Sequence, residues 1–130
     1  MKNKKAQAAT EFLILVGLIL FVTIMFVAGL GSYADKIATA KEESVFDDYG
    51  GYLQNEFITA SQVKDGYSRE LILPDSIRGH EYSISNTNQS IKIISKRSEM
   101  EFFYDIPYAQ GTLEKGKNRI IKENGSILIK

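Results

Sequence analysis

The chain has 130 residues, no cysteine, and 16 basic against 16 acidic side chains, so its formal net charge at pH 7 is zero. This length allows one domain plus a short additional segment, and the lack of cysteine excludes a disulfide framework and a thiolate metal site. The balanced and interspersed charge predicts no nucleic-acid partner.

A long apolar segment lies near the N-terminus. The 19 residues from Phe12 to Leu30 carry no charge, and a helix of this length spans about 28 Å, close to the hydrocarbon thickness of a bilayer. We therefore expect a transmembrane helix. Three of the first five residues are lysine, whereas the charges just beyond the apolar run cancel. The positive-inside rule then places the N-terminus in the cytoplasm and the residues after about Gly31 outside.

A single carboxylate, Glu11, borders this apolar run. An acidic group near hydrocarbon costs free energy, so its position needs a reason. One interpretation is helix capping, with Thr10 as the N-cap and Glu11 in the first turn. There the positive end of the helix dipole stabilises an acid by about 0.3–1 kcal/mol.

The sequence KKAQAATEFLILVG also resembles the class III (prepilin-type) signal peptide of archaeal type IV pilin-like proteins. The resemblance implies cleavage between Ala6 and Gln7, so that Gln7 begins the mature chain and Glu11 is its fifth residue. The chain departs from the family pattern in two places. Ala6 stands where glycine is commonest, and Ala9 with Thr10 replaces the small hydroxyl residue often found two places before the glutamate.

A conventional secretory signal is an alternative. The small residues at 32–34 and 38–40 suit a signal peptidase, which would release the chain after Ala34 or Ala40. However, the apolar run is longer than the usual ~7–15 residues of such a signal.

A helical pattern continues beyond the apolar run without proline, which predicts one helix from about Ala9 to Ser61. The pairs Gly29/Gly31 and Gly50/Gly51 are the places where a kink costs least. The charged residues Glu42, Glu43, Asp47 and Asp48 are expected on a solvated helix face, not in a cation site. The apolar stripe consists of Tyr33, Ile37, Ala40, Val45, Tyr49, Leu53 and Phe57, and we expect Ile37, Tyr49, Leu53 and Phe57 to pack on a sheet.

Short runs of strand composition follow a turn at residues 64–66. The dipeptide Asn124-Gly125 between two β-branched runs is a strong hairpin signal, because both positions accept positive φ. We therefore predict an α+β fold with an antiparallel β-sheet head on the outer half of the helix. The predicted strands are 70–73, 80–85, 90–95, 100–104, 118–122 and 126–129.

The second half of the chain is also loosely similar to the heads of archaeal pilin-like proteins, through the runs ILPDSIRGHEYSI and IPYAQGTLEKG. The predicted organisation is a cytoplasmic leader at 1–6, a transmembrane or filament-core helix at 7–31, the outer half of the helix at 32–62 and the sheet head at 63–130.

Little in the sequence indicates catalysis. The single histidine, His80, has no clustered cysteine or carboxylate neighbours, and no phosphate loop, nucleophile elbow or zinc motif occurs. We predict neither an enzyme nor a cofactor. The sequons at Asn88 and Asn124 lie at predicted turns on the outer side and are candidate N-glycosylation sites.

The resemblance implies a structural subunit of an archaeal type IV pilus-like filament on the cell surface, and adhesion, motility and DNA uptake are the alternative roles of such a filament. Such a subunit is processed by a prepilin peptidase, resides in the membrane before assembly, and forms a homo-oligomeric filament with the help of a pilus assembly machinery. The alternative is a single-pass membrane-anchored extracytoplasmic binding protein that does not polymerise.

Overall fold

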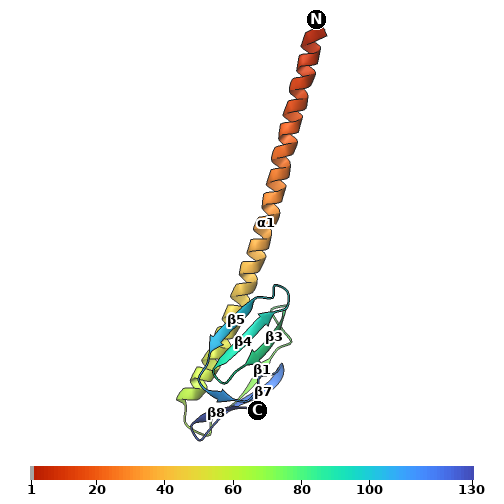
Figure 1. Cartoon of the computed structure of the whole chain (residues 1–130). Helices are drawn as coiled ribbons and strands as arrows, with labels where there is room; N and C mark the ends of the chain where they lie inside the picture. The colour runs from red at the N-terminus through yellow and green to blue at the C-terminus, as the bar shows by residue number, and fades with distance from the viewer. Residues whose placement is uncertain (1) are drawn as a thin grey trace. The chain divides into compact units, whose positions relative to one another are not determined.

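The computed structural model describes residues 2–130, which form one helix followed by eight strands (Figure 1). Helix α1 runs from Lys2 to Gln62. It starts earlier than predicted because the leader contains good helix formers and no breaker. Its helical conformation also continues without interruption through Gly50 and Gly51, so no unwound turn forms there.

The chain divides into two compact units, one ending at Thr39 and the other comprising Ala40–Lys130. We call the second unit the head. It contains the C-terminal part of α1 and all the strands. The α+β fold class is thus confirmed.

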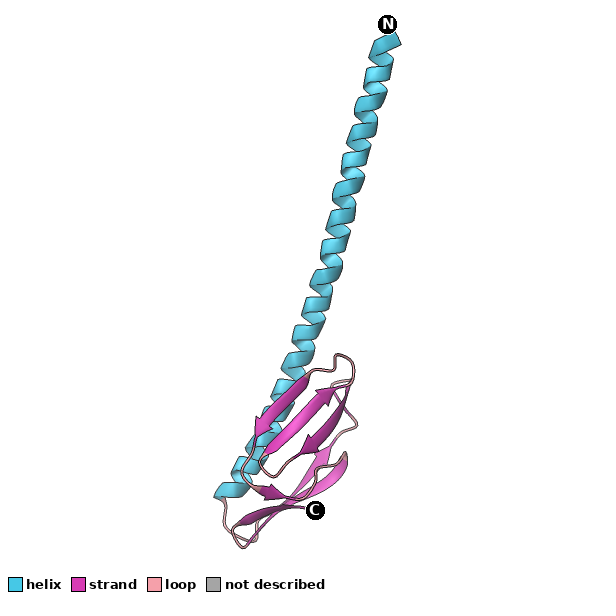
Figure 2. Ribbon diagram, in the orientation of Figure 1, coloured by secondary structure: helices cyan, strands magenta, loops and turns pink. Residues whose placement is uncertain are grey.

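The head contains two four-stranded sheets (Figure 2). Neighbouring strands are antiparallel except for β6 and β8, which are parallel. All six predicted strands are present, and β2 and β6 are two additional strands of two residues each. One sheet has the order β1 (Ser68–Leu73), β7 (Gly116–Glu123), β8 (Ser126–Ile129) and β6 (Ala109–Gln110), and the other β2 (Ser76–Ile77), β3 (His80–Asn86), β4 (Ser90–Ser95) and β5 (Glu101–Asp105).

The predicted hairpin turn between β7 and β8 is present. Asn124 has φ 50° and Gly125 has φ 75°, and Glu123 pairs with Ser126 across them. Positive φ at both central residues gives the turn that matches the twist of paired strands. A second turn of this kind, unpredicted, joins β2 to β3 at Arg78 (φ 48°) and Gly79 (φ 85°).

The core forms between α1 and one face of the strands. Val45, Leu53 and Phe57 of the predicted stripe are buried, and Tyr49 is half-buried against this core. The expectation for Ile37 is wrong, since its side chain is 52% exposed. The stripe contributes to the core only within the head, where α1 also buries Phe46, a residue outside the predicted stripe.

Gly50 marks a close approach between helix and sheet. A Cβ atom at this position would lie 2.0 Å from ring atoms of Tyr104, on β5. The Tyr104 hydroxyl donates to the carbonyl of Phe46 at 3.1 Å and to Asp47 Oδ1 at 3.2 Å. Gly50 therefore permits the tyrosine ring to lie directly on the helix backbone. Gly51 has open space instead.

The prediction that Glu42 lies on a solvated helix face is wrong. Its side chain is only 1% exposed. The hydroxyl of Ser95 donates to Glu42 Oε1, and the hydroxyl of Ser98 donates to the same oxygen at 3.2 Å. Arg97 Nη1 lies 3.8 Å from Glu42 Oε2. The carboxylate thus connects α1 to the turn after β4, and its polar partners explain how a charge is accommodated in the core.

Candidate functional site

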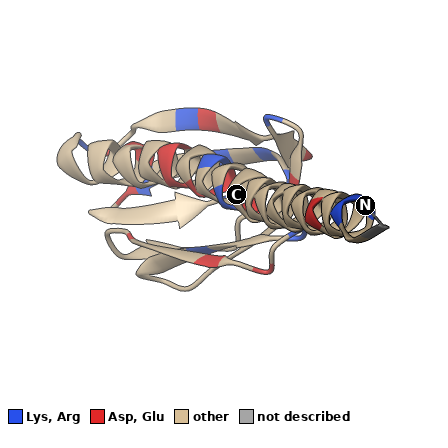
Figure 3. Ribbon diagram, turned by 90° about the horizontal axis from the view of Figure 1, so that it is seen from above, with Lys and Arg blue, Asp and Glu red and all other residues tan. Residues whose placement is uncertain are grey.

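The largest apolar surface of the chain is the N-terminal part of α1. Its large side chains are exposed between Phe12 and Leu30, with Ile24 and Phe26 each at 67%. Within the described residues, this helix is the one that is long and apolar enough to cross a membrane. Figure 3 shows the corresponding uncharged length of ribbon between the charged N-terminal turns and the charges farther along α1. Monomeric soluble proteins rarely expose a contiguous apolar area larger than a few hundred Å². The helix is therefore compatible with membrane anchoring.

Two hydroxyl side chains, one within this surface and one just beyond it, form hydrogen bonds to carbonyl groups of the same helix. Thr23 Oγ1 donates to the carbonyl of Ile19 at 2.8 Å, and Ser32 Oγ donates to the carbonyl of Ala28 at 3.4 Å. Lipid offers no hydrogen-bond partner, so a polar group in a membrane helix must be paired internally. These bonds suit the helix to an apolar environment.

The front edge of the apolar run carries the predicted processing residues. Ala6 and Gln7 are exposed and helical. Gln7 Nε2 donates to Glu11 Oε1 at 3.0 Å, so the two residues already contact each other across one helical turn. Thr10 is not an N-cap, because the helix starts at Lys2 and the Thr10 hydroxyl donates to the carbonyl of Ala6 at 3.0 Å. In the uncleaved chain Glu11 therefore lies inside the helix, beyond its first turn.

The two candidate glycosylation residues lie in exposed turns of the head. Asn88 is in the turn between β3 and β4, where its carbonyl accepts a hydrogen bond from the amide of Ala109 at 2.8 Å. Asn124 is in the turn between β7 and β8. Both residues are exposed to solvent.

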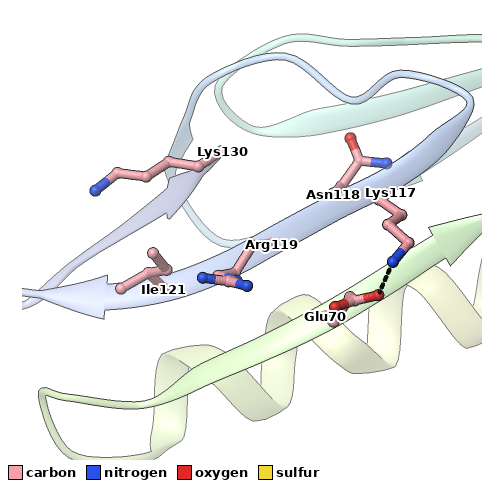
Figure 4. A pocket seen from close by; sticks show the side chains of 6 residues that line it. All are labelled: Glu70, Lys117, Asn118, Arg119, Ile121 and Lys130. Atoms are coloured by element: carbon pink, nitrogen blue, oxygen red, sulfur yellow. Dashed lines mark ion pairs between the residues drawn. The ribbon is translucent and has the colours of Figure 1, made fainter.

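The head has an open surface cavity of about 510 Å³ over β1, β7 and the end of the chain (Figure 4). Three of its lining side chains are cations, Lys117, Arg119 and Lys130, and one is the carboxylate of Glu70. Lys117 Nζ lies 3.5 Å from Glu70 Oε1. Such exposed charges offer a binding surface for anions, and none of them is a nucleophile activated by a neighbouring base.

His80 begins β3, and its ring lies 6.1 Å from that of Phe46 in an edge-on arrangement. Among the described residues no group of three histidine, cysteine or acidic side chains is placed to hold a metal ion. The features that indicate a function are therefore the apolar helix surface, the residues Gln7 and Glu11 at its N-terminal edge, and the charged surface of the head.

In comparisons with known proteins, no family model, no curated protein and no solved structure matched this chain.

Proposed function

We propose that this chain is a structural subunit of an archaeal type IV pilus-like extracellular filament. The observation that carries the proposal is the exposed, uncharged helix surface of residues 12–30, bordered by Gln7 and Glu11. The head has its own core, so the helix surface must be covered by something outside the chain. Lipid covers it in the precursor, and copies of the same helix cover it in the filament.

The helix surface suits both environments because the hydrophobic effect is non-directional and favours burial of apolar side chains in lipid as well as against other apolar helices. A contact between different surfaces of identical subunits closes into a ring if the rotation between neighbouring subunits allows it. Otherwise the contact generates an open helical fibre. A single kind of subunit is therefore sufficient for a filament.

Cleavage between Ala6 and Gln7 creates a cationic amine on Gln7. Glu11 lies one helical turn away and already reaches the Gln7 side chain in the uncleaved chain. In the apolar filament interior the carboxylate is the counter-charge for this amine, in its own subunit or in a neighbour. Loss of one partner of a buried ion pair costs roughly 3–5 kcal/mol.

The test is Glu11→Gln, expressed at the wild-type level, with filaments counted by electron microscopy and the processed N-terminus confirmed by intact mass. We expect processing and membrane insertion to continue and filaments to be lost. Glu114→Gln, on the exposed surface of the head, is the matched control and should leave filaments unchanged. Abundant normal filaments from Glu11→Gln would overturn the assembly role of this carboxylate.

The second candidate function is a membrane-anchored binding protein that does not polymerise, which the surface cavity at Lys117 and Arg119 favours. Intact mass separates the two. Filament subunits begin at Gln7, whereas an anchored protein keeps the leader. A start at Asp35 or Lys41 would instead indicate a secretory signal. The prepilin peptidase, the assembly machinery and a glycan on Asn88 or Asn124 belong to the filament proposal.

A further inference from the structure

We propose that the cationic surface of one head binds an acidic pair on the head of a second copy of this chain. The basic surface consists of Lys117, Arg119 and Lys130, and the acidic pair consists of Glu43 and Asp47 on α1. This inference rests on the proposed function, because it names the contact that would link heads along a filament.

The basic surface places like charges side by side. Arg119 and Lys130 exchange backbone hydrogen bonds of 2.6 and 2.9 Å, so their side chains are cross-strand neighbours. Like charges in this position destabilise a sheet. The carboxylate of Glu70 lies opposite Arg119 but forms its ion pair with Lys117. Even with a main-chain carboxylate on Lys130, the surface keeps an excess of positive charge.

The acidic pair also places like charges next to each other, but these charges are negative. Glu43 and Asp47 are four residues apart and both exposed, an arrangement in which like charges destabilise a helix. No basic residue stands three or four positions from either of them. Asp47 receives a hydrogen bond from Tyr104, which holds the carboxylate in place without neutralising it.

The two surfaces lie on different elements of the head, and no ion pair joins them among the described residues. On β7, Asn118 and Ile120 point into the core, so Lys117 and Arg119 project from the opposite face of the sheet. On α1 the neighbouring residue Glu42 is buried against the strands, whereas Glu43 and Asp47 are exposed. The basic surface thus lies on the outer face of a sheet, and the acidic pair lies on the exposed side of α1.

Opposite charges on separate surfaces of the same subunit favour a contact between copies, because the pairing relieves both repulsions. Such a contact joins different surfaces, so it propagates along a fibre when the rotation between subunits does not close a ring. Ile72, 62% exposed and paired with Lys117 across β1 and β7, adds apolar area beside the basic surface.

Cross-linking of the full chain tests this contact, since the chain has no cysteine of its own. Glu43→Cys and Arg119→Cys are combined in one chain and treated with a bis-maleimide whose reach matches a Glu–Arg ion pair. We expect a ladder of trimers and larger species, because each copy links to two others. Either single substitution should give no species larger than a dimer. The control pair is Glu43→Cys with Glu81→Cys, an exposed position on β3, which should give no ladder.

Charge reversal provides the second measurement. Arg119→Glu with Lys130→Glu should reduce filament number about tenfold or more, since like charges across an interface cost several kcal/mol. Adding Glu43→Lys and Asp47→Lys should restore most of the filaments. Filaments that persist in the first variant, or a ladder equally strong in the control pair, would overturn the contact and leave the filament proposal intact. If the wild type forms no filaments, the filament proposal fails, and cross-linking of the chain in detergent micelles decides the contact alone.

Discussion

Replacement of Gly50 by alanine should destabilise the head, whereas the same change at its neighbour Gly51 should not. The difference comes from one ring. A Cβ at Gly50 would lie 2.0 Å from Tyr104 Cε2 and Cζ, while nothing lies within 4 Å of a Cβ at Gly51. Carbon atoms in contact are normally about 3.5–4.0 Å apart, so the ring must move by more than an ångström.

The magnitude follows from three contributions. Overpacking typically costs about 1–3 kcal/mol. A displaced ring also loses the Tyr104 hydrogen bond to the Phe46 carbonyl, worth about 1 kcal/mol. The better helix propensity of alanine returns about 1 kcal/mol. The expected net loss for Gly50→Ala is therefore about 1–3 kcal/mol, against a gain of up to about 1 kcal/mol for Gly51→Ala.

The assay is thermal unfolding of the full chain in detergent micelles, followed by near-ultraviolet circular dichroism. The chain has seven tyrosines and no tryptophan, and six of the tyrosines lie in the head, so this signal reports its packing. In a Tyr104→Ala background the penalty for Gly50→Ala should disappear, because residues in contact are energetically coupled. Equal unfolding temperatures for the two glycine variants would refute the reasoning.

Three further predictions concern the head. Leu53→Ala should lower its unfolding free energy by about 2–5 kcal/mol in the same assay, because the side chain is fully buried. Glu42→Ala should cost about 1–3 kcal/mol, since it leaves the hydroxyl hydrogen of Ser95 without its acceptor, whereas Glu43→Ala should stay within about 0.5 kcal/mol. Burial, and then the nearby Asp47 carboxylate, raise the pKa of Tyr104 above its ordinary value of 10.0, so the neutral phenol is favoured in the folded state. Stability should therefore be independent of this group below about pH 10 and fall above it, and Tyr104→Phe should reduce the slope of that fall in a pH series of unfolding temperatures.

Much of the head follows from local sequence patterns. Strands β4 and β8 have the bounds predicted for them, because alternating apolar residues and an Asn-Gly turn are local signals. Strands β2 and β6 were missed since two residues carry no period. Their pairing, including the parallel pairing of β6 with β8, depends on distant segments. The turn at Arg78 was missed because arginine seldom adopts positive φ.

The environment of single side chains was less predictable. Glu42 stands in a charged run beside Glu43, and nothing local distinguishes the buried carboxylate from the exposed one. The serines that bind Glu42 lie more than 50 residues away, so only the fold brings them together. Ile37 continues the apolar period of the helix but lies outside the compact head. Periodicity predicts which face of a helix is apolar but not where along the helix a partner begins.

The filament and anchor hypotheses predict different free-energy costs for removing the charge of Glu11. In an uncleaved anchor the helix starts near Lys2, and Glu11 lies within the helix at the lipid boundary, with the leader lysines close in sequence. Its charge then has alternative partners and water, so neutralising it should cost at most about 1 kcal/mol. Removal of the leader takes those lysines away and leaves the new amine of Gln7 as the cation closest in sequence to Glu11. The free-energy cost of Glu11→Gln must therefore depend on cleavage. We expect a small cost in a chain whose processing is blocked at Ala6 and a large cost in a processed chain. An equally small effect in both chains would favour a permanent membrane anchor.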